Sequence, residues 1–133
     1  MLVFVLLLSF ALLILPISMI YFGKCYKENA PKERNKTLRY RTKMSMINDD
    51  TWKFAHNYWG EICGKIGVFL VPIPILPMMF SLFILKNDIE HIGVVGFFVI
   101  AIIIIEITAY HVAIFLTEKA LKKTFNRNGM RIK

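Results

Sequence analysis

Three long apolar runs, each long enough to cross a lipid bilayer, constrain the fold of this chain more than any other feature. They cover Leu2–Phe22, Ile62–Leu85 and Gly93–Leu116. A helix needs about 20 consecutive apolar residues to span the hydrocarbon layer, and lipid offers no hydrogen-bond partner to the backbone of an open strand. We therefore expect an all-α membrane protein with three transmembrane helices, organised as one module over residues 1–133.

Charged residues lie mostly outside these runs, and their distribution is uneven. The net charge is +8 at pH 7, and basic residues dominate both the segment between the first two runs and the segment after the third. The short segment 86–92 carries one lysine and two acids. Because short basic loops stay in the cytoplasm, we predict an external N-terminus, a cytoplasmic loop over 23–61 and a cytoplasmic tail over 117–133. We interpret the basic charge as a topology signal with attraction to anionic lipid, not as nucleic-acid binding.

The loop before the second run contains a helical pattern of its own. Asn48, Asp49 and Asp50 are typical of a helix start, where such side chains accept hydrogen bonds from free backbone N–H groups. Apolar residues then recur at three- and four-residue steps as a stripe, namely Trp52, Ala55, Trp59, Ile62 and Ile66. Since tryptophan prefers the headgroup level, we predict a short interfacial helix over Asp49–Gly60 on the cytoplasmic membrane surface. The alternative is that these residues are simply the start of the second span.

The second run combines signals for close packing with signals for a broken helix. Its first part has glycines at helical spacing, which favour close contact with another helix: Gly60, Gly64 and Gly67. Its middle contains Pro72, Pro74 and Pro77, each of which removes a backbone donor. The carbonyl groups expected to lose their helical partners are those of Val68, Leu70 and Ile73. Neighbouring helices or water must then satisfy them.

A single acidic residue interrupts the third run near its middle. Glu106 follows four isoleucines, and Tyr110 continues its face one turn later. An acid at the centre of a transmembrane helix costs about 2.5–3.5 kcal/mol on insertion scales and marks a functional site by default. Burial disfavours the charged form, so we expect Glu106 to be largely protonated at neutral pH. Three roles stay open: a clasp that donates to the carbonyls freed by the prolines, a ligand or proton site, and contact with a partner protein.

The sequence contains no recognisable catalytic or metal-binding motif. His56, His91 and His111 are predicted to lie at different depths or on different faces, and the two cysteines match no zinc spacing. A glycine-rich phosphate loop is absent, and no serine or cysteine lies beside a base at helical spacing. We therefore expect no catalytic residues, no metal site, no cofactor and no enzymatic activity.

One stretch of the chain has a specific pattern. It reads Tyr40-Arg41-Thr42, then Ser45-Met46, Asn48, Thr51-Trp52, Phe54-Ala55-His56, Tyr58, Gly60 and Lys65-Ile66-Gly67. This stretch resembles the signature of the SdpI family, in which a loop reading roughly Gly-Tyr-Arg-Thr leads into Trp-x-x-Ala and a following glycine. Arg39 stands where that family usually has its first glycine.

The resemblance implies a bacterial plasma-membrane protein similar to an immunity protein that acts against a secreted sporulation-delay toxin. It also implies recruitment of a small transcriptional repressor to the cytoplasmic face when the toxin is present. The site residues that it implies, for contact with toxin, partner or headgroups, are Tyr40, Arg41, Thr42, Trp52, Ala55 and Gly60. In physical terms, Arg41 is suited to phosphate headgroups or acidic partners, and Trp52 to anchoring the interfacial helix.

Two alternatives to toxin immunity or sensing stay open. The first is a small ion-coupled transporter that uses Glu106 and the broken second span, which would require a homo-oligomer to line a path. The second is an accessory subunit of a larger membrane complex.

Overall fold

The computed structural model describes residues 2–32, 40–87 and 92–132, and most of these residues are helical. The helices are α1 (Leu2–Glu28), α2 (Asp49–Leu70), α3 (Pro72–Asn87) and α4 (Ile92–Thr124). By length and hydropathy, three stretches are long and apolar enough to cross a membrane: Leu6–Glu28, Asp49–Leu76 and Gly93–Thr124. The predicted all-α fold with three transmembrane helices is confirmed.

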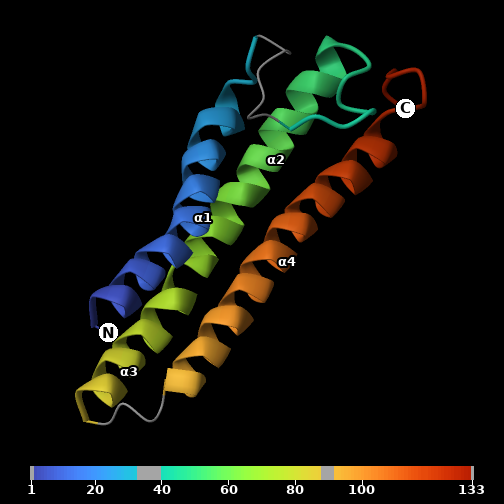
Figure 1. Cartoon of the computed structure of the whole chain (residues 1–133). Coiled ribbons are helices and arrows are strands. Elements are labelled where there is room, and N and C mark those ends of the chain that lie inside the picture. The colour runs from blue at the N-terminus through green and yellow to red at the C-terminus, as the bar shows by residue number, and fades with distance from the viewer. Residues whose placement is uncertain (1, 33–39, 88–91, 133) are drawn as a thin grey trace.

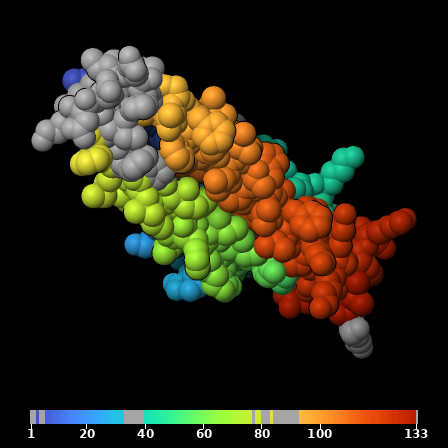
Figure 2. Space-filling model, turned by 90° about the horizontal axis from the view of Figure 1, so that it is seen from below, coloured from blue at the N-terminus to red at the C-terminus, as the bar shows by residue number. Residues whose placement is uncertain are grey.

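The helices form an elongated antiparallel bundle in which α2 and α3 follow each other as one rod (Figure 1). The α1–α2 connection and the C-terminus lie at one end of the bundle, and the N-terminus lies at the other. The face seen in Figure 2 is formed by α4 beside α2 and α3, with α1 visible only at its edge. We call the end with the C-terminus the basic end, because it carries Lys24, Lys27, Arg41, Lys43, Lys122, Lys123, Arg127 and Arg131.

The rod is interrupted where the prolines begin, as predicted. Val71 separates α2 from α3, and Pro72 is the first residue of α3. Proline is tolerated at a first helical position because the N–H that it lacks would have no partner there. The dihedral angles of Val71 remain in the right-handed helical region, with φ −52° and ψ −46°. The prolines therefore divide one membrane span into two helices without turning the chain back.

Glycine residues bring α1 and α2 into backbone contact. A Cβ atom on Gly23 would lie 2.6 Å from the Cα of Gly64, and one on Gly60 would lie 2.8 Å from the backbone nitrogen of Lys27. A Cβ on Gly67 would lie 2.9 Å from a backbone oxygen of α1. The close contact predicted for the glycines of the second run is confirmed, and Gly23 supplies its counterpart on α1.

The helices at the basic end are longer than the apolar runs. α1 continues to Glu28 and α4 to Thr124, so parts of the predicted loop 23–61 and tail 117–133 are helical. The predicted interfacial helix over Asp49–Gly60 is not a separate helix in the structure. Residues Asp49–Gly60 are the first half of α2, continuous with the span, which was the alternative interpretation.

The apolar stripe on the first half of α2 lies inside the protein instead of on the membrane surface. Trp52 is 3% exposed and Trp59 is 5% exposed, while Ala55 is fully buried. The physical reason is that α1 and α4 extend past their apolar runs and cover the stripe. An amphipathic helix buries its apolar face against whichever surface is available, and here that surface is protein.

Candidate functional site

Five of the six residues matched to the family signature are buried or half-buried at the basic end. Tyr40 is 5% exposed, Trp52 is 3% exposed, and Ala55 and Gly60 are buried. Thr42 is half-buried, whereas the Arg41 side chain is exposed. The structure therefore brings the matched residues together as a packed assembly, from which Arg41 projects.

Tyr40 joins the loop before α2 to α4. Its hydroxyl donates a hydrogen bond of 2.9 Å to Oε1 of Glu118 and lies 3.4 Å from the carbonyl oxygen of Ile114. Burial, followed by the hydrogen bond to Glu118, raises the pKa of Tyr40 well above its usual range. Tyr40 is therefore a neutral donor at physiological pH, and it holds the loop against α4.

Aromatic rings fill the space among α1, α2 and this loop. We call this group the aromatic cluster; its members are Phe22, Tyr26, Tyr40, Trp52, His56 and Trp59. The shortest ring separation is 4.0 Å, between Trp52 and His56. The rings of Tyr26 and Tyr40 meet His56 edge-on. Such tilted and edge-on contacts are the favoured geometries of aromatic pairs, so the cluster fixes the mutual position of the three segments.

Trp52 has a structural role that differs from the predicted one. Its Nε1 donates a hydrogen bond of 2.7 Å to the carbonyl oxygen of Pro31, at the end of the described part of the α1–α2 connection. Nδ1 of His56 lies 2.9 Å from the carbonyl oxygen of Trp52, which can only accept, so the proton must be on Nδ1. The indole does not anchor a surface helix at the headgroup level. It ties the connection to α2 from inside the protein.

Thr42 organises the loop through a reciprocal contact with Ser45. The N–H of Thr42 donates to Oγ of Ser45 at 2.9 Å, and the N–H of Ser45 donates to Oγ1 of Thr42 at 3.2 Å. The Ser45 hydroxyl donates in turn to the Thr42 carbonyl at 3.0 Å. Hydroxyl side chains often replace regular backbone partners in this way at turns. The Thr42 side chain therefore shapes the loop that presents Arg41.

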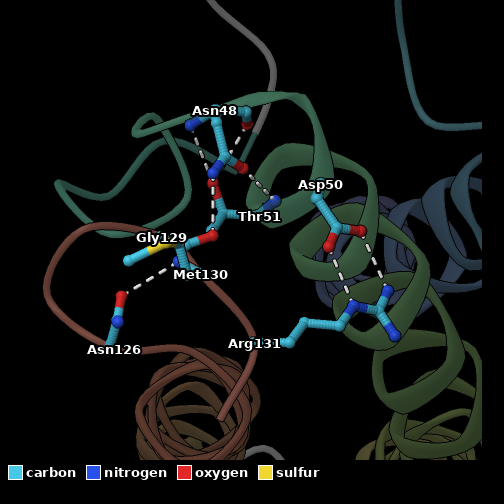
Figure 3. Close-up of polar contacts among 7 residues, drawn as sticks. All are labelled: Asn48, Asp50, Thr51, Asn126, Gly129, Met130 and Arg131. Carbon is cyan, nitrogen blue, oxygen red and sulfur yellow. Dashed lines mark hydrogen bonds and ion pairs between the residues drawn. The ribbon is translucent and has the colours of Figure 1, made fainter.

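The last residues of the chain fold back as a hook onto the start of α2, a feature that was not predicted from the sequence. Asn48 caps α2 by accepting from the N–H of Thr51 at 2.8 Å, and its Nδ2 donates to the carbonyl oxygen of Gly129 at 2.7 Å (Figure 3). Asp50 forms a bidentate ion pair with Arg131, with nitrogen–oxygen distances of 2.8 and 2.9 Å. The hook, residues 125–132, thus closes on the helix start that the sequence did predict.

Gly129 is required by the geometry of the hook. Its φ of +75° lies in the left-handed region, where side chains are unfavourable. A Cβ there would also lie 2.6 Å from Nδ2 of Asn48. The side chain of Asn126 accepts from the N–H groups of Asn128 and Met130 and holds the turn. The Asn-Gly pair at 128–129 is a turn signal from which this feature could have been found.

A groove of about 1100 Å³ lies at the basic end, between the loop and the hook. Apolar side chains contribute to its lining, namely Met44, Ile47, Phe125 and Ile132. Three basic side chains and one acid also line it: Lys43, Lys122, Arg127 and Glu118. Thr42 of the matched residues lies on its wall. A surface with apolar lining and excess positive charge is suited to an acidic, partly apolar partner.

Glu106 faces the interior of the bundle at the level of the membrane. It belongs to a buried stripe on α4 whose members are Ile102, Glu106, Ala113, Thr117 and Leu121. Glu106 is 5% exposed, and its Oε1 has no hydrogen-bond partner among the residues that the structure describes. Tyr110 is half-buried one turn further on. The predicted hydrogen bond to the carbonyls of Val68, Leu70 or Ile73 is not formed by this atom, and the role of Glu106 stays a prediction.

Comparison with known proteins assigns the chain to a family. Residues 32–110 match the SdpI/YfhL protein family. The chain belongs to the SdpI/YfhL family. The match covers more than half of the sequence and includes the matched signature residues, the proline-interrupted span and Glu106. No curated protein and no solved structure matches the chain.

Family membership and the helices together make the chain a multi-pass membrane protein of the SdpI type. SdpI/YfhL is not a known enzyme family. Within residues 2–32, 40–87 and 92–132, no group of three or more histidine, cysteine or acidic side chains is arranged to hold a metal ion. Arg39, which departs from the family signature, and His91 lie outside the described residues. All of α1 and the hook lie outside the family match, so they are features of this chain and not of the matched segment.

Proposed function

We propose that this SdpI/YfhL protein acts in a bacterial plasma membrane, where it protects against, or senses, a membrane-active peptide toxin. The observation that carries the proposal is the family match over 32–110, which includes both the packed signature residues and the interrupted span. The packing of these residues supports a role in recognition, because it holds the α1–α2 connection, α2 and α4 in one fixed arrangement.

For orientation, we propose that the N-terminus is external and that the basic end is cytoplasmic. The concentration of lysine and arginine at that end supports this, since basic short loops stay on the cytoplasmic side. Reporter fusions after Asn87 and at the C-terminus are expected to score as external and cytoplasmic, respectively. A cytoplasmic signal from the Asn87 fusion would contradict the three-span topology.

For signalling, the groove between loop and hook is the surface that we propose for a cytoplasmic protein such as a small transcriptional repressor. Its apolar lining and basic side chains support binding of an acidic, partly apolar segment. Arg41 projects from the adjoining loop. The groove is formed by the loop that Tyr40 ties to α4, so a shift of α4 caused by a bound peptide would alter its shape.

The assay is survival of a toxin-sensitive bacterium that expresses the protein, challenged with several membrane-active peptides. We expect protection against at least one peptide. Arg41→Ala is expected to reduce protection without lowering the amount of protein in the membrane, because its side chain is exposed. Lys53→Ala, which removes an exposed positive charge from α2 at a variable position of the signature, is the matched control. Wild-type cells that are no better protected than empty-vector cells against every peptide would contradict the proposal.

One observation favours a second function. The buried Oε1 of Glu106, without a described partner, is suited to a proton or cation site of an ion-coupled transporter or of a membrane complex. Broken helices beside such an acid recur in transporters. Uptake or ion flux by the purified protein in vesicles, abolished by Glu106→Gln, would support this function over immunity.

A further inference from the structure

A second groove lies on the outer surface of the bundle where α1 and α2 cross, with a volume of about 430 Å³. Gly23, Gly60 and Gly64 contribute to its lining. Gly23 and Gly60 face the backbone of the opposite helix, whereas Gly64 leaves space between the residues that flank the crossing. A Cβ on Gly64 would meet only the Cα of Gly23 within contact range, at 3.7 Å, so there is room above this part of the crossing.

The side of the groove nearer the basic end is positively charged. Lys24 and Lys27 line it from α1, and Lys65 lines it from α2. One acid is also present: Glu61, which accepts a hydrogen bond of 2.7 Å from Nζ of Lys65. All four side chains are exposed. Three positive charges and one negative charge give the groove a net charge of +2, which favours binding of an anion.

The depth of these lysines in the membrane indicates what that anion is. The apolar run of α1 ends at Phe22, so at about 1.5 Å per residue Lys24 and Lys27 lie roughly 3–8 Å beyond the hydrocarbon boundary. The headgroup layer is about 5–7 Å thick on each side. Lys65 lies one turn inside the second run, from which a long side chain reaches the same layer. The positive charges therefore converge at the level of lipid phosphates.

The other side of the groove is apolar and faces away from the bundle. Ile20, Val68 and Phe69 line it, and Val68 and Phe69 are 62% and 81% exposed. The groove therefore has positive charge at the headgroup level and apolar surface below it. These two parts are complementary to the phosphate and to an acyl chain of a phospholipid. A second protein helix fits less well, because packing it over the glycines would desolvate the lysines without neutralising them.

We infer that this groove binds an anionic phospholipid of the leaflet at the basic end, with its phosphate among Lys24, Lys27 and Lys65 and an acyl chain along Val68 and Phe69. Basic pockets between transmembrane helices on the cytoplasmic side recognise anionic headgroups in this manner. The bound lipid would cover the outer side of the α1–α2 contact. This inference rests on the groove alone and does not depend on the proposed response to a peptide.

The test is lipid binding by the full-length protein in detergent, with phosphatidylglycerol as the anionic probe and phosphatidylcholine as the zwitterionic one. Native mass spectrometry reports the lipids bound, and titration reports their affinity. The groove variant combines Lys24→Gln, Lys27→Gln and Lys65→Gln. The matched control combines Lys53→Gln, Lys119→Gln and Lys123→Gln, which remove equal charge from exposed positions at the same end but outside the groove.

We expect the wild type and the control to bind phosphatidylglycerol in preference to phosphatidylcholine, and the groove variant to bind phosphatidylglycerol at least about tenfold more weakly. Gly64→Leu, which fills the hollow and keeps every lysine, is expected to lose the lipid as well. The circular dichroism of the lysine variants should match the wild type because the lysines are exposed, and that of Gly64→Leu should match because the space beside Gly64 is open. Soluble glycerol 3-phosphate should not displace the lipid, since it lacks the acyl chains.

Four results would overturn the inference. Equal weakening in the control would mean that only the overall basic charge attracts lipid. Equal binding of both lipids by the wild type would remove the role of the lysines, and displacement by glycerol 3-phosphate would remove that of the apolar side. A dimer that Gly64→Leu dissociates, with lipid binding unchanged, would show that a second copy occupies the groove.

Discussion

α1 and α4 both pack against α2, but their closest contacts are of different kinds. α1 meets α2 where side chains are missing, with Gly23 and Gly64 so close that their backbones touch. α4 and the hook meet α2 and its preceding loop through individual side chains, including the Tyr40–Glu118 hydrogen bond and the edge-on contact of Phe54 with Phe125 of the hook at 5.4 Å. The first interface therefore includes a contact that depends on the absence of side chains, beside the aromatic contacts of Phe22 and Tyr26, whereas the second depends on individual side chains.

The difference has consequences for movement. A backbone contact between two helices has little freedom to adjust, because a shift must move whole helices. Side-chain contacts and exposed ion pairs can be exchanged one at a time. We therefore expect α1 and α2 to behave as a single unit, and α4 with its hook to be the part that shifts when a ligand binds.

The largest effect is expected from Gly23→Leu. The new side chain would meet the backbone of Gly64 at its first atom, so α1 and α2 must separate. We expect a loss of about 3 kcal/mol in the free energy of unfolding, the upper part of the usual range for overpacking. Unfolding in detergent, followed by circular dichroism, measures it.

Gly64→Ala is the matched control for this substitution, because its Cβ meets only the Cα of Gly23, at an ordinary contact distance of 3.7 Å. We expect its stability to stay close to that of the wild type. Equal stability of Gly23→Leu and the wild type would contradict the backbone contact between α1 and α2.

A smaller effect is expected from Tyr40→Phe, which removes the hydroxyl that joins the loop to α4. A hydrogen bond to a charged group contributes about 1.5–3 kcal/mol, and the partial exposure of Glu118 favours the lower value. The loss should disappear when Glu118→Gln is already present, if the two groups act through each other. A double-mutant cycle of unfolding free energies tests this coupling, and additive losses would refute it.

Substitution of Glu106 tests whether a hydrogen bond at mid-membrane also holds α4 against the interrupted span. If its carboxyl donates a hydrogen bond to the carbonyls of the interrupted span, Glu106→Leu should weaken packing by about 0.6–2 kcal/mol. Because Oε1 has no partner among the described residues, we instead expect Leu to raise stability by about 1 kcal/mol, as a buried unsatisfied atom is removed.

Activity of the Glu106 variants separates the remaining roles. Gln keeps the shape and hydrogen-bonding ability of a protonated Glu but cannot ionise. We expect both Gln and Leu variants to insert normally into the membrane. Loss of activity in both, at matched expression, would show that ionisation is required. Wild-type activity in both would make Glu106 dispensable.

The smallest effect is expected from Arg131→Ala. Its ion pair with Asp50 is exposed, and exposed pairs contribute little because water and salt screen them. We expect stability to be almost unchanged but the exposed hook to exchange backbone hydrogens faster, with the difference largest at low salt. Hydrogen exchange of residues 125–132 measures it, with Arg127→Ala as a control outside the ion pair. Unchanged exchange would show that Asn48 and Gly129 hold the hook alone.

The sequence predicts the helices well because membrane spans leave few alternatives. The apolar runs, the start of α2 at Asn48, the interruption at Pro72 and the contact of the glycines each follow from a local rule, and the structure confirms all four. The interfacial helix was predicted wrongly because the stripe of Trp52, Ala55 and Trp59 shows that one face is apolar, not what covers it.

For the candidate site, the signature residues form one packed assembly at the basic end, and their contact with toxin, partner or headgroups stays a prediction. The signature implied contacts of Tyr40, Thr42 and Trp52 with toxin, partner or headgroups. In the structure these residues are hydrogen-bonded to Glu118, Ser45 and Pro31. Those partners lie 78, 3 and 21 residues away, and only the Ser45 contact is local. Pairing across such distances depends on which helix lies beside which, and no periodicity encodes that.

By itself, therefore, the sequence determined that the chain is helical, where it can cross a membrane, and that an acid lies at mid-span, because lipid forces each span to satisfy its own backbone. Only the tertiary structure decided what the amphipathic start of α2 packs against, that the chain end returns to Asn48 and Asp50, and that Arg41 projects from the packed signature residues. These outcomes depend on how far α1 and α4 extend past their apolar runs, and on side chains that meet only once the three helices are side by side.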